Sequence, residues 1–242
     1  MPAAYQLAGQ RRAGRAGTDQ TRAEIKEIAV RQLAAGGLES ESVALLRIAK
    51  EIGMSGPALY RYFASRDDLL AEMGVGAYKA VAAEVQAVDV SAGGRRALHA
   101  LATAFRDWAA AQPHLYLLIQ GTPVPGFRPP DETLAHARAV LGPFLPVFLK
   151  GRPVPSVDPL VGEFSHWLRA DAAVGEWVQQ WTGLPPEDPA SAVALTGAIT
   201  AWPQMHGTVS LESAGQFTGM GHRPATLLAV QIDMLADSFQ LA

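Results

Sequence analysis

Residues 43–68 read VALLRIAKEIGMSGPALYRYFASRDD, and this stretch decides the fold. Leu45, Ile48 and Ile52 recur at a spacing that places them on one face of a helix. Gly53 follows directly, and glycine accepts the left-handed conformation found just after a helix ends. The stretch therefore predicts a short helix that stops at this glycine.

A second short helix is predicted to begin after Ser55, a residue suited to an N-cap, with Pro57 tolerated in the first turn. Leu59 and Phe63 lie one turn apart and are expected to face inward. The side chains on or beside the outer face are then those of Gly56, Ala58, Tyr60, Arg61 and Tyr62. Small residues at the start of a helix, followed by Tyr and Arg, are suited to the major groove of DNA.

The run at residues 48–70 resembles the DNA-binding signature of the TetR (tetracycline-repressor-like) family. That signature has an Ile-Ala pair, a Gly turn, a small polar cap, a Leu-Tyr-x-His/Tyr-Phe segment, and a basic residue followed by an acidic residue and Leu. The matching positions are Ile48, Ala49, Gly53, Ser55, Leu59, Tyr60, Tyr62, Phe63, Arg66 and Leu69. Arg47 departs from the family, which often has an acidic residue there. The resemblance covers the first third of the chain and implies an all-α transcriptional regulator.

The candidate DNA contacts follow from this reading. Arg61 is the best candidate for reading a base, since arginine can bind guanine with two hydrogen bonds. Phosphate contacts are expected from Ser55, Tyr60, Tyr62 and Arg66, and more weakly from Arg47. The small side chains of Gly56 and Ala58 would let the helix approach the groove closely, and Pro57 between them is also a candidate DNA contact.

Upstream, Thr21 and Glu24 have the spacing of a capping box, which predicts a helix that begins after Thr21. It would complete a three-helix DNA-binding domain over residues 18–66, with residues 38–42 as a connection. Residues 1–17 are rich in Ala, Gly and Arg and predict a flexible basic arm. The arm could reach DNA or remain a solvated tail, and its basic residues are Arg11, Arg12 and Arg15.

Residues 67–242 are predicted to form a helical ligand-binding and dimerisation domain, beginning with a helix capped by Ser65. Amphipathic helical patterns recur along this part, a loop is expected over residues 122–130, and no segment alternates as a strand does. Five aromatic side chains are candidates for a pocket that takes an apolar or amphipathic ligand: Trp108, Tyr116, Phe144, Phe148 and Trp167. The alternative for these residues is ordinary core packing.

The last two long helices are predicted over residues 190–206 and 224–240. Where the first of them ends, Trp202, His206 and Gly207 resemble the Trp-His-Gly signature of one subgroup of TetR-like regulatory domains. In that family the last two helices of each subunit pair with those of a second subunit, which implies a homodimer. The candidate interface residues are Val193, Ile199, Trp202, His206, Leu227, Leu228 and Leu235.

Composition limits the other classes of function. Residues 1–70 carry ten Lys/Arg against eight Asp/Glu, and the remainder carries ten against fifteen, so the positive end is the DNA-binding end. The chain has no cysteine, no long apolar run, no HExxH metal motif and no catalytic signature. We expect a cytoplasmic protein that is not an enzyme, with no cofactor, metal or membrane partner.

The sequence is therefore interpreted as a homodimeric repressor that leaves a palindromic double-stranded DNA operator when a small-molecule effector binds its C-terminal domain. Two alternatives remain. One is an activator of the same fold, and the other is a ligand-sequestering protein whose DNA-binding unit is vestigial. Because the phosphate-contact set is complete, it argues against the second alternative.

Overall fold

The computed structural model describes residues 3–36, 43–120 and 131–242, and in these residues the chain forms helices and no strand. This confirms the predicted all-α fold. The predicted connection at residues 38–42 and loop at 122–130 lie outside the described residues. Two compact units, Met1–Gly74 and Val75–Ala242, are described separately below. Helix α4, Arg66–Gln86, begins in the first unit and ends in the second.

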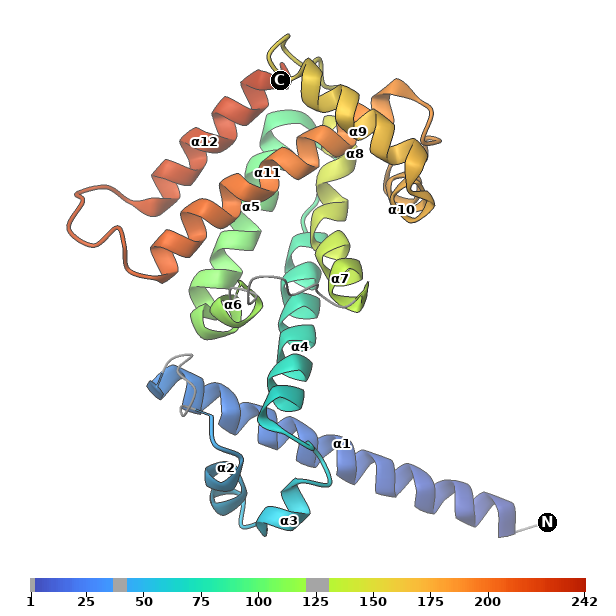
Figure 1. The fold of residues 1–242 in the computed structure, drawn as a ribbon, viewed down its shortest axis with the longest axis vertical. Coiled ribbons are helices and arrows are strands. Elements are labelled where there is room, and N and C mark those ends of the chain that lie inside the picture. Colours follow the sequence, from blue (N-terminus) through green and yellow to red (C-terminus); the bar gives the residue numbers. More distant parts are fainter. Residues whose placement is uncertain (1–2, 37–42, 121–130) are drawn as a thin grey trace. The chain divides into compact units, whose positions relative to one another are not determined.

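The N-terminal unit contains α1 (Ala3–Gly36), α2 (Leu45–Glu51), α3 (Gly56–Leu59) and the start of α4. Figure 1 shows α2 and α3 beside the C-terminal half of α1. Apolar side chains from each element are removed from solvent, as the helical spacing predicts. They include Ile25, Leu33, Ile48, Leu59, Phe63 and Leu69.

The prediction that the first helix begins after Thr21 is wrong. The helix begins at Ala3, and Thr21 lies inside it, where its hydroxyl donates a 2.9 Å hydrogen bond to the carbonyl of Gly17. A threonine inside a helix can bond one turn back in this way instead of capping a helix start. Residues 3–17 therefore have a helical backbone and not the irregular one expected of an arm.

The turn after α2 has the predicted left-handed glycine. Gly53 has φ +69°, the N–H of Met54 donates to the carbonyl of Ala49 at 2.8 Å, and the N–H of Gly53 donates to that of Lys50 at 3.3 Å. These two bonds satisfy the last carbonyls of the helix in the Schellman arrangement. The predicted cap of α4 is also confirmed, since Ser65 Oγ accepts the N–H of Asp68 at 3.0 Å.

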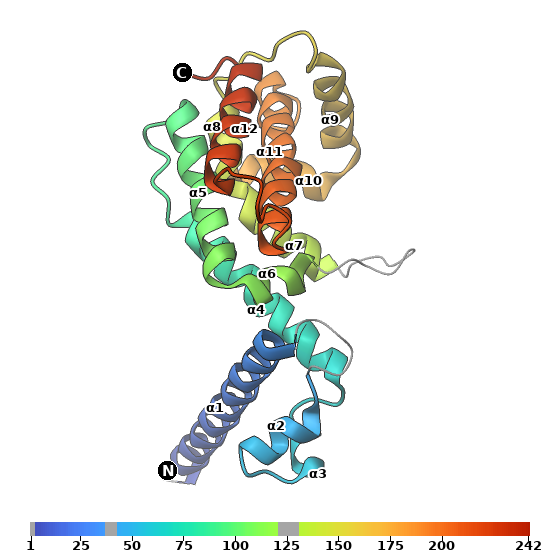
Figure 2. The ribbon, with the colours of Figure 1, turned by 90° about the vertical axis from the view of Figure 1, so that its left-hand side faces the viewer.

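The C-terminal unit continues from α4 through further helices to α11 and α12. Its elements are α5 (Gly94–Ala111), α6 (Pro113–Gln120), α7 (Asp131–Leu141), the 3-10 helix η1 (Gly142–Phe144), α8 (Leu145–Phe148), α9 (Asp158–Ala170), α10 (Ala172–Thr182), α11 (Pro189–Ser213) and α12 (Pro224–Ser238). Helix α11 contacts α5, α8, α9, α10 and α12, so it forms the centre of this unit. Figure 2 shows α5, α11 and α12 side by side.

A glycine allows close packing between α11 and α8. A Cβ atom on Gly197 of α11 would lie 2.2 Å from the Phe148 ring, which is fully buried. The same ring also meets Phe239, with 4.9 Å between the ring centroids. Because core side chains are packed to the density of a crystal, Phe148 has little room to move away.

Candidate nucleic-acid interface

Helix α3 continues beyond Leu59 as a hydrogen-bonded turn. The N–H of Tyr62 donates to the carbonyl of Leu59 at 2.8 Å, and that of Phe63 donates to the same carbonyl at 3.2 Å. Leu59 and Phe63 are buried, as predicted, at 0% and 2% exposure. The two buried residues orient the segment, so Tyr60 and Arg61 lie between them on the exposed side.

The predicted DNA contacts occupy two classes of position. The exposed residues are Arg47, Ser55, Pro57, Tyr60 and Arg61. The half-buried residues are Gly56, Ala58, Tyr62 and Arg66. Ser55 stands at the N-cap of α3 with an extended backbone, but its hydroxyl makes no capping hydrogen bond within the described residues. The predicted N-cap position of Ser55 is therefore confirmed, but without a hydrogen bond from a backbone N–H of the described residues to its hydroxyl.

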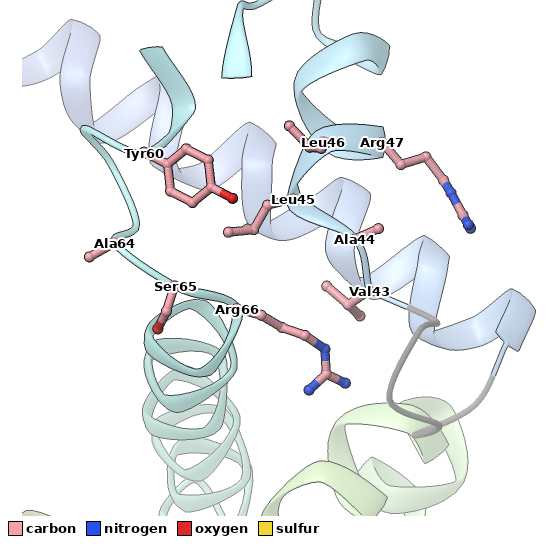
Figure 3. A pocket seen from close by; sticks show the side chains of 9 residues that line it. All are labelled: Val43, Ala44, Leu45, Leu46, Arg47, Tyr60, Ala64, Ser65 and Arg66. Atoms are coloured by element: carbon pink, nitrogen blue, oxygen red, sulfur yellow. The ribbon is translucent and has the colours of Figure 1, made fainter. Parts of the chain in front are cut away.

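A shallow groove of about 660 Å³ brings several of these residues together (Figure 3). It lies between the start of α2 and the start of α4. Its lining contains two guanidinium groups and two hydroxyls on an apolar floor, from Val43, Ala44, Leu45, Leu46, Arg47, Tyr60, Ala64, Ser65 and Arg66. Guanidinium and hydroxyl groups are the side chains that bind phosphate oxygens.

The cations of the groove are weakly paired. The closest carboxylate oxygen to Arg66 is that of its neighbour Asp67, at 3.8 Å from Nη1, and the buried Nε of Arg66 has no partner among the described residues. Arg47 makes no ion pair within the described part of the chain. A phosphate in the groove would meet the charge of Arg47, unpaired among these residues, and the weakly paired charge of Arg66.

Two residues behind this surface were missed by sequence reasoning. Arg22 of α1 donates to the carbonyl of Tyr62 at 2.6 Å and forms an ion pair with Glu72 of α4. The partners are separated by 40 and 50 positions in the chain. No local spacing links residues so far apart, so the sequence carried no signal for this contact.

The five predicted pocket residues differ in their exposure to solvent. Tyr116, Phe144 and Phe148 are fully buried and Trp108 nearly so, whereas Trp167 is 37% exposed. Their ring contacts also differ, because Tyr116 meets Phe105 and His206, and Trp167 meets Phe164. A cavity of about 490 Å³ is lined by other residues, namely Gln86, Ala135, Arg138, Ala139, Ala173, Glu176, Trp177, Gln180 and Trp181.

His206 lies in an aromatic cluster of the C-terminal unit. Its Nδ1 is 3.1 Å from the hydroxyl of Tyr116, and its ring centroid is 4.0 Å from that of Trp202 and 5.0 Å from that of Phe105. Burial lowers the pKa of His206 to about 4, because the apolar surroundings disfavour the imidazolium. The imidazole is therefore neutral at pH 7.

This burial predicts an acid-sensitive stability. In the unfolded chain His206 binds a proton below about pH 6.5, but in the folded chain only below about pH 4. Between these values protonation favours unfolding, so stability falls as the pH is lowered. We expect a loss of about 2 kcal/mol between pH 7 and pH 5. Urea unfolding at both pH values should show a smaller loss for His206→Gln.

His222→Gln is the matched control, because that histidine is exposed in the turn before α12. It should keep the pH dependence of the wild-type protein. An equal pH dependence in His206→Gln and in the wild-type protein would contradict the role given to His206.

Two predicted interface residues need correction. Leu228 and Leu235 are 3% and 1% exposed, because both belong to the core of their own subunit, and they have no surface to offer a partner. Half-buried positions are held by Val193, Ile199, Trp202, His206 and Leu227. The large apolar side chains of α12 that are exposed are instead those of Val230 and Met234, at 51% and 64%.

The described residues also limit other classes of site. None of their helices combines the length and apolar character needed to cross a membrane. Within the same residues, no group of three His, Asp or Glu side chains is placed to hold a metal ion.

Comparisons with known proteins match both units. Residues 25–73 match the family described as bacterial regulatory proteins, tetR family, and residues 98–235 match the tetracyclin repressor-like C-terminal domain. HTH-type transcriptional regulator Rv1816 of Mycobacterium tuberculosis is 32% identical over 213 residues, which is 86% of each chain. Regulator Mb1846 of Mycobacterium bovis gives the same values. The Trp-His-Gly subgroup stays a prediction.

Solved structures agree with these matches. SCO4313, named as a regulatory protein, is 38% identical with a TM-score of 0.70, and the match covers 91% of this chain and 97% of that one. A tetR family regulator from Shewanella sp. PV-4 is 15% identical with a TM-score of 0.53, covering 91% of this chain and 98% of its own. The second likeness concerns the fold alone.

Proposed function

The chain belongs to the TetR family of DNA-binding bacterial transcriptional regulators, and we propose that it is a homodimeric repressor of a near-palindromic operator. The observation that carries the DNA-binding mode is the groove with Arg47 and Arg66 beside the exposed Tyr60 and Arg61. The family consists of regulators and not of enzymes. A regulator of this kind acts on chromosomal DNA, so we place the protein in the cytoplasm.

In this proposal α3 enters the major groove and Arg61 reads a base, while the residues of the groove hold the phosphate backbone. Ser55 and Tyr60 would add hydroxyl donors, since both are exposed. Phosphate contacts fix the position of the protein and base contacts choose the sequence. Two-fold symmetry would place the half-sites about 34–36 Å apart, or a multiple of this.

The surface proposed for dimerisation is the exposed apolar side of α12, defined by Val230 and Met234. Their spacing of four residues puts them on one side of the helix. The other side packs on α5 and α11, and its side chains Leu228, Ile232 and Leu235 are buried. Since the inward side is occupied within the subunit, only the outward side is left for a partner.

The dimer proposal predicts a change of assembly in a charged variant. Val230→Glu/Met234→Glu should shift the protein from dimer to monomer, because a dimer would then bury carboxylates without partners. Sedimentation at several concentrations measures this. The control is Leu134→Glu, which also charges an exposed apolar residue, on α7. A dimer that survives the double change at micromolar concentration would place the interface elsewhere.

We also propose that a small amphipathic ligand releases the repressor from DNA. The cavity lined by Arg138, Trp177 and Trp181 supports this better than the aromatic residues predicted from the sequence, because it is accessible and combines aromatic faces with charged groups. The protein has one conformation that binds DNA and one that does not. An effector releases DNA only if it binds the second conformation more tightly than the first. DNA affinity unchanged by every ligand of this unit would contradict the proposal.

Selection of bound sequences from a random duplex library, at a stated salt concentration, tests the central proposal. Recovery of a near-palindrome is the expected result. Recovery of nothing above background would favour the alternative of a ligand-sequestering protein. Repressor and activator would then be separated by transcription from a promoter that contains the recovered sequence.

A further inference from the structure

We propose that Arg22 of α1 is a positioning residue for DNA binding: its guanidinium holds the turn that carries Tyr60 and Arg61, and Glu72 of α4 holds the guanidinium. This inference rests on the DNA-binding function proposed above. It adds two residues that lie outside the groove and outside the exposed side of α3.

The first contact fixes the backbone of the turn. Nη1 of Arg22 donates to the carbonyl oxygen of Tyr62 at 2.6 Å. This carbonyl receives no backbone hydrogen bond in the described residues, since the helical bonding of the segment ends at Phe63. Carbonyls at the end of a helical segment need such an outside partner. Arg22 supplies it from another helix.

The second contact fixes the side chain that anchors the turn. The Cζ atom of Arg22 lies 4.4 Å from the centroid of the Phe63 ring, within the range of a cation–π interaction. Phe63 is 2% exposed and belongs to the core of the N-terminal unit. One guanidinium therefore contacts both residues at the end of the turn, directly after Tyr60 and Arg61.

The third contact orients the guanidinium itself. Glu72 pairs with Nη2 of Arg22 through one oxygen and with Nζ of Lys26, at 3.0 Å, through the other. Burial acts to raise the pKa of the Glu72 carboxyl, but the hydrogen bonds from Arg22 and Lys26 outweigh it and lower the pKa. The carboxylate is ionised at neutral pH and can hold Arg22 in place.

Only arginine has the geometry for these three contacts. It offers two separate Nη groups and a flat face at the same time, whereas lysine offers one nitrogen on a flexible chain. Arg22→Lys thus preserves the charge but cannot bind Tyr62, Phe63 and Glu72 together. Because the Nη groups of Arg22 are already engaged within the protein, the residue is not expected to contact a phosphate.

The test measures the affinity of full-length protein for the duplex that the wild-type protein selects, and for a scrambled duplex of equal length. Arg22→Lys should weaken binding to the selected duplex about tenfold, which corresponds to one hydrogen bond to a charged group. The dependence of affinity on salt concentration should keep the wild-type slope, because no phosphate contact is lost.

Two control variants match the test. Arg31 also lies on α1 and pairs with Glu51 at 2.6 Å, but it has no contact with Tyr62 or Phe63 among the described residues. Arg31→Lys should bind within about twofold of the wild-type protein. Glu72→Gln and Glu51→Gln each remove one negative charge from the protein. Both variants should therefore gain the same non-specific electrostatic attraction to DNA. The positioning role requires Glu72→Gln to bind the selected duplex more weakly than Glu51→Gln.

Amide hydrogen exchange provides a measurement without DNA. The amides of residues 60–65 should exchange faster in Arg22→Lys, while those of α11 should stay as in the wild-type protein. If Arg22→Lys does not fold, as judged by circular dichroism, the two glutamate variants decide the result by the same comparison.

The outcomes separate this inference from the function on which it rests. If the wild-type protein selects no sequence, both are overturned. If it selects one, and Arg22→Lys binds like Arg31→Lys, only the positioning role is overturned. A salt slope reduced by about one in Arg22→Gln would mean that Arg22 contacts a phosphate directly, which also contradicts the positioning role.

Discussion

Replacing Arg47 and Arg66 together by alanine is expected to weaken binding to selected and scrambled duplexes by a similar factor, roughly 100-fold in all. Both side chains line the groove of the N-terminal unit, and neither is neutralised by a close ion pair among the described residues. Every DNA sequence carries phosphates, so removing the two arginine–phosphate contacts should not change the sequence preference. Titrations at several salt concentrations should show a slope reduced by about two.

A second double variant controls for net charge. Lys150→Ala/Arg152→Ala removes two exposed cations from the C-terminal unit and leaves the groove intact. It should keep the wild-type salt slope. Arg61→Ala complements this comparison, because loss of a base contact should relax the preference at one position of each half-site. If both double variants lowered affinity equally, overall charge and not the groove would explain binding.

Replacing Gly197 by alanine is expected to destabilise the C-terminal unit by about 2 kcal/mol, because the added methyl group overlaps the Phe148 ring. The change should otherwise stabilise a helix, since alanine is the better helix former. A destabilising result therefore isolates the steric contact. Urea unfolding at equal protein concentrations measures it, because dimerisation would add a concentration term.

Gly162→Ala is expected to change the stability in the opposite direction. Gly162 lies inside α9 and is exposed, and a methyl group added there would meet no atom within 4 Å among the described residues, apart from its own helix and neighbours. This variant should be more stable than the wild-type protein by about 0.5–1 kcal/mol. If Gly197→Ala and Gly162→Ala shifted stability in the same direction, Phe148 would have moved aside and the tight contact would not limit the core.

The two units differed in how well their sites could be predicted. In the N-terminal unit the buried Leu59 and Phe63, the left-handed Gly53 and the cap at Ser65 were predicted correctly. Each depends on residues within one or two helical turns. Thr21 was misread because a capping sequence also fits inside a helix, where the hydroxyl bonds to the preceding turn.

In the C-terminal unit the apolar residues were identified, but the face on which each lies was not. Leu228 and Val230 are both apolar and two positions apart, yet the first is 3% and the second 51% exposed. Composition could not distinguish them, because the helix turns about 200° between them. Which face turns inward depends on α5 and α11, which the local pattern of α12 does not contain.

The sequence by itself determined the all-α class, the helix–turn–helix around Gly53 and the family, since these follow from caps, helical spacing and a continuous motif. The tertiary structure alone decided the Arg22–Glu72 pair, the Gly197–Phe148 contact and the outward position of Met234. The physical reason is the separation along the chain over which each interaction acts. Backbone preferences act within a few residues, whereas packing and charge pairing join residues that only the completed fold brings together.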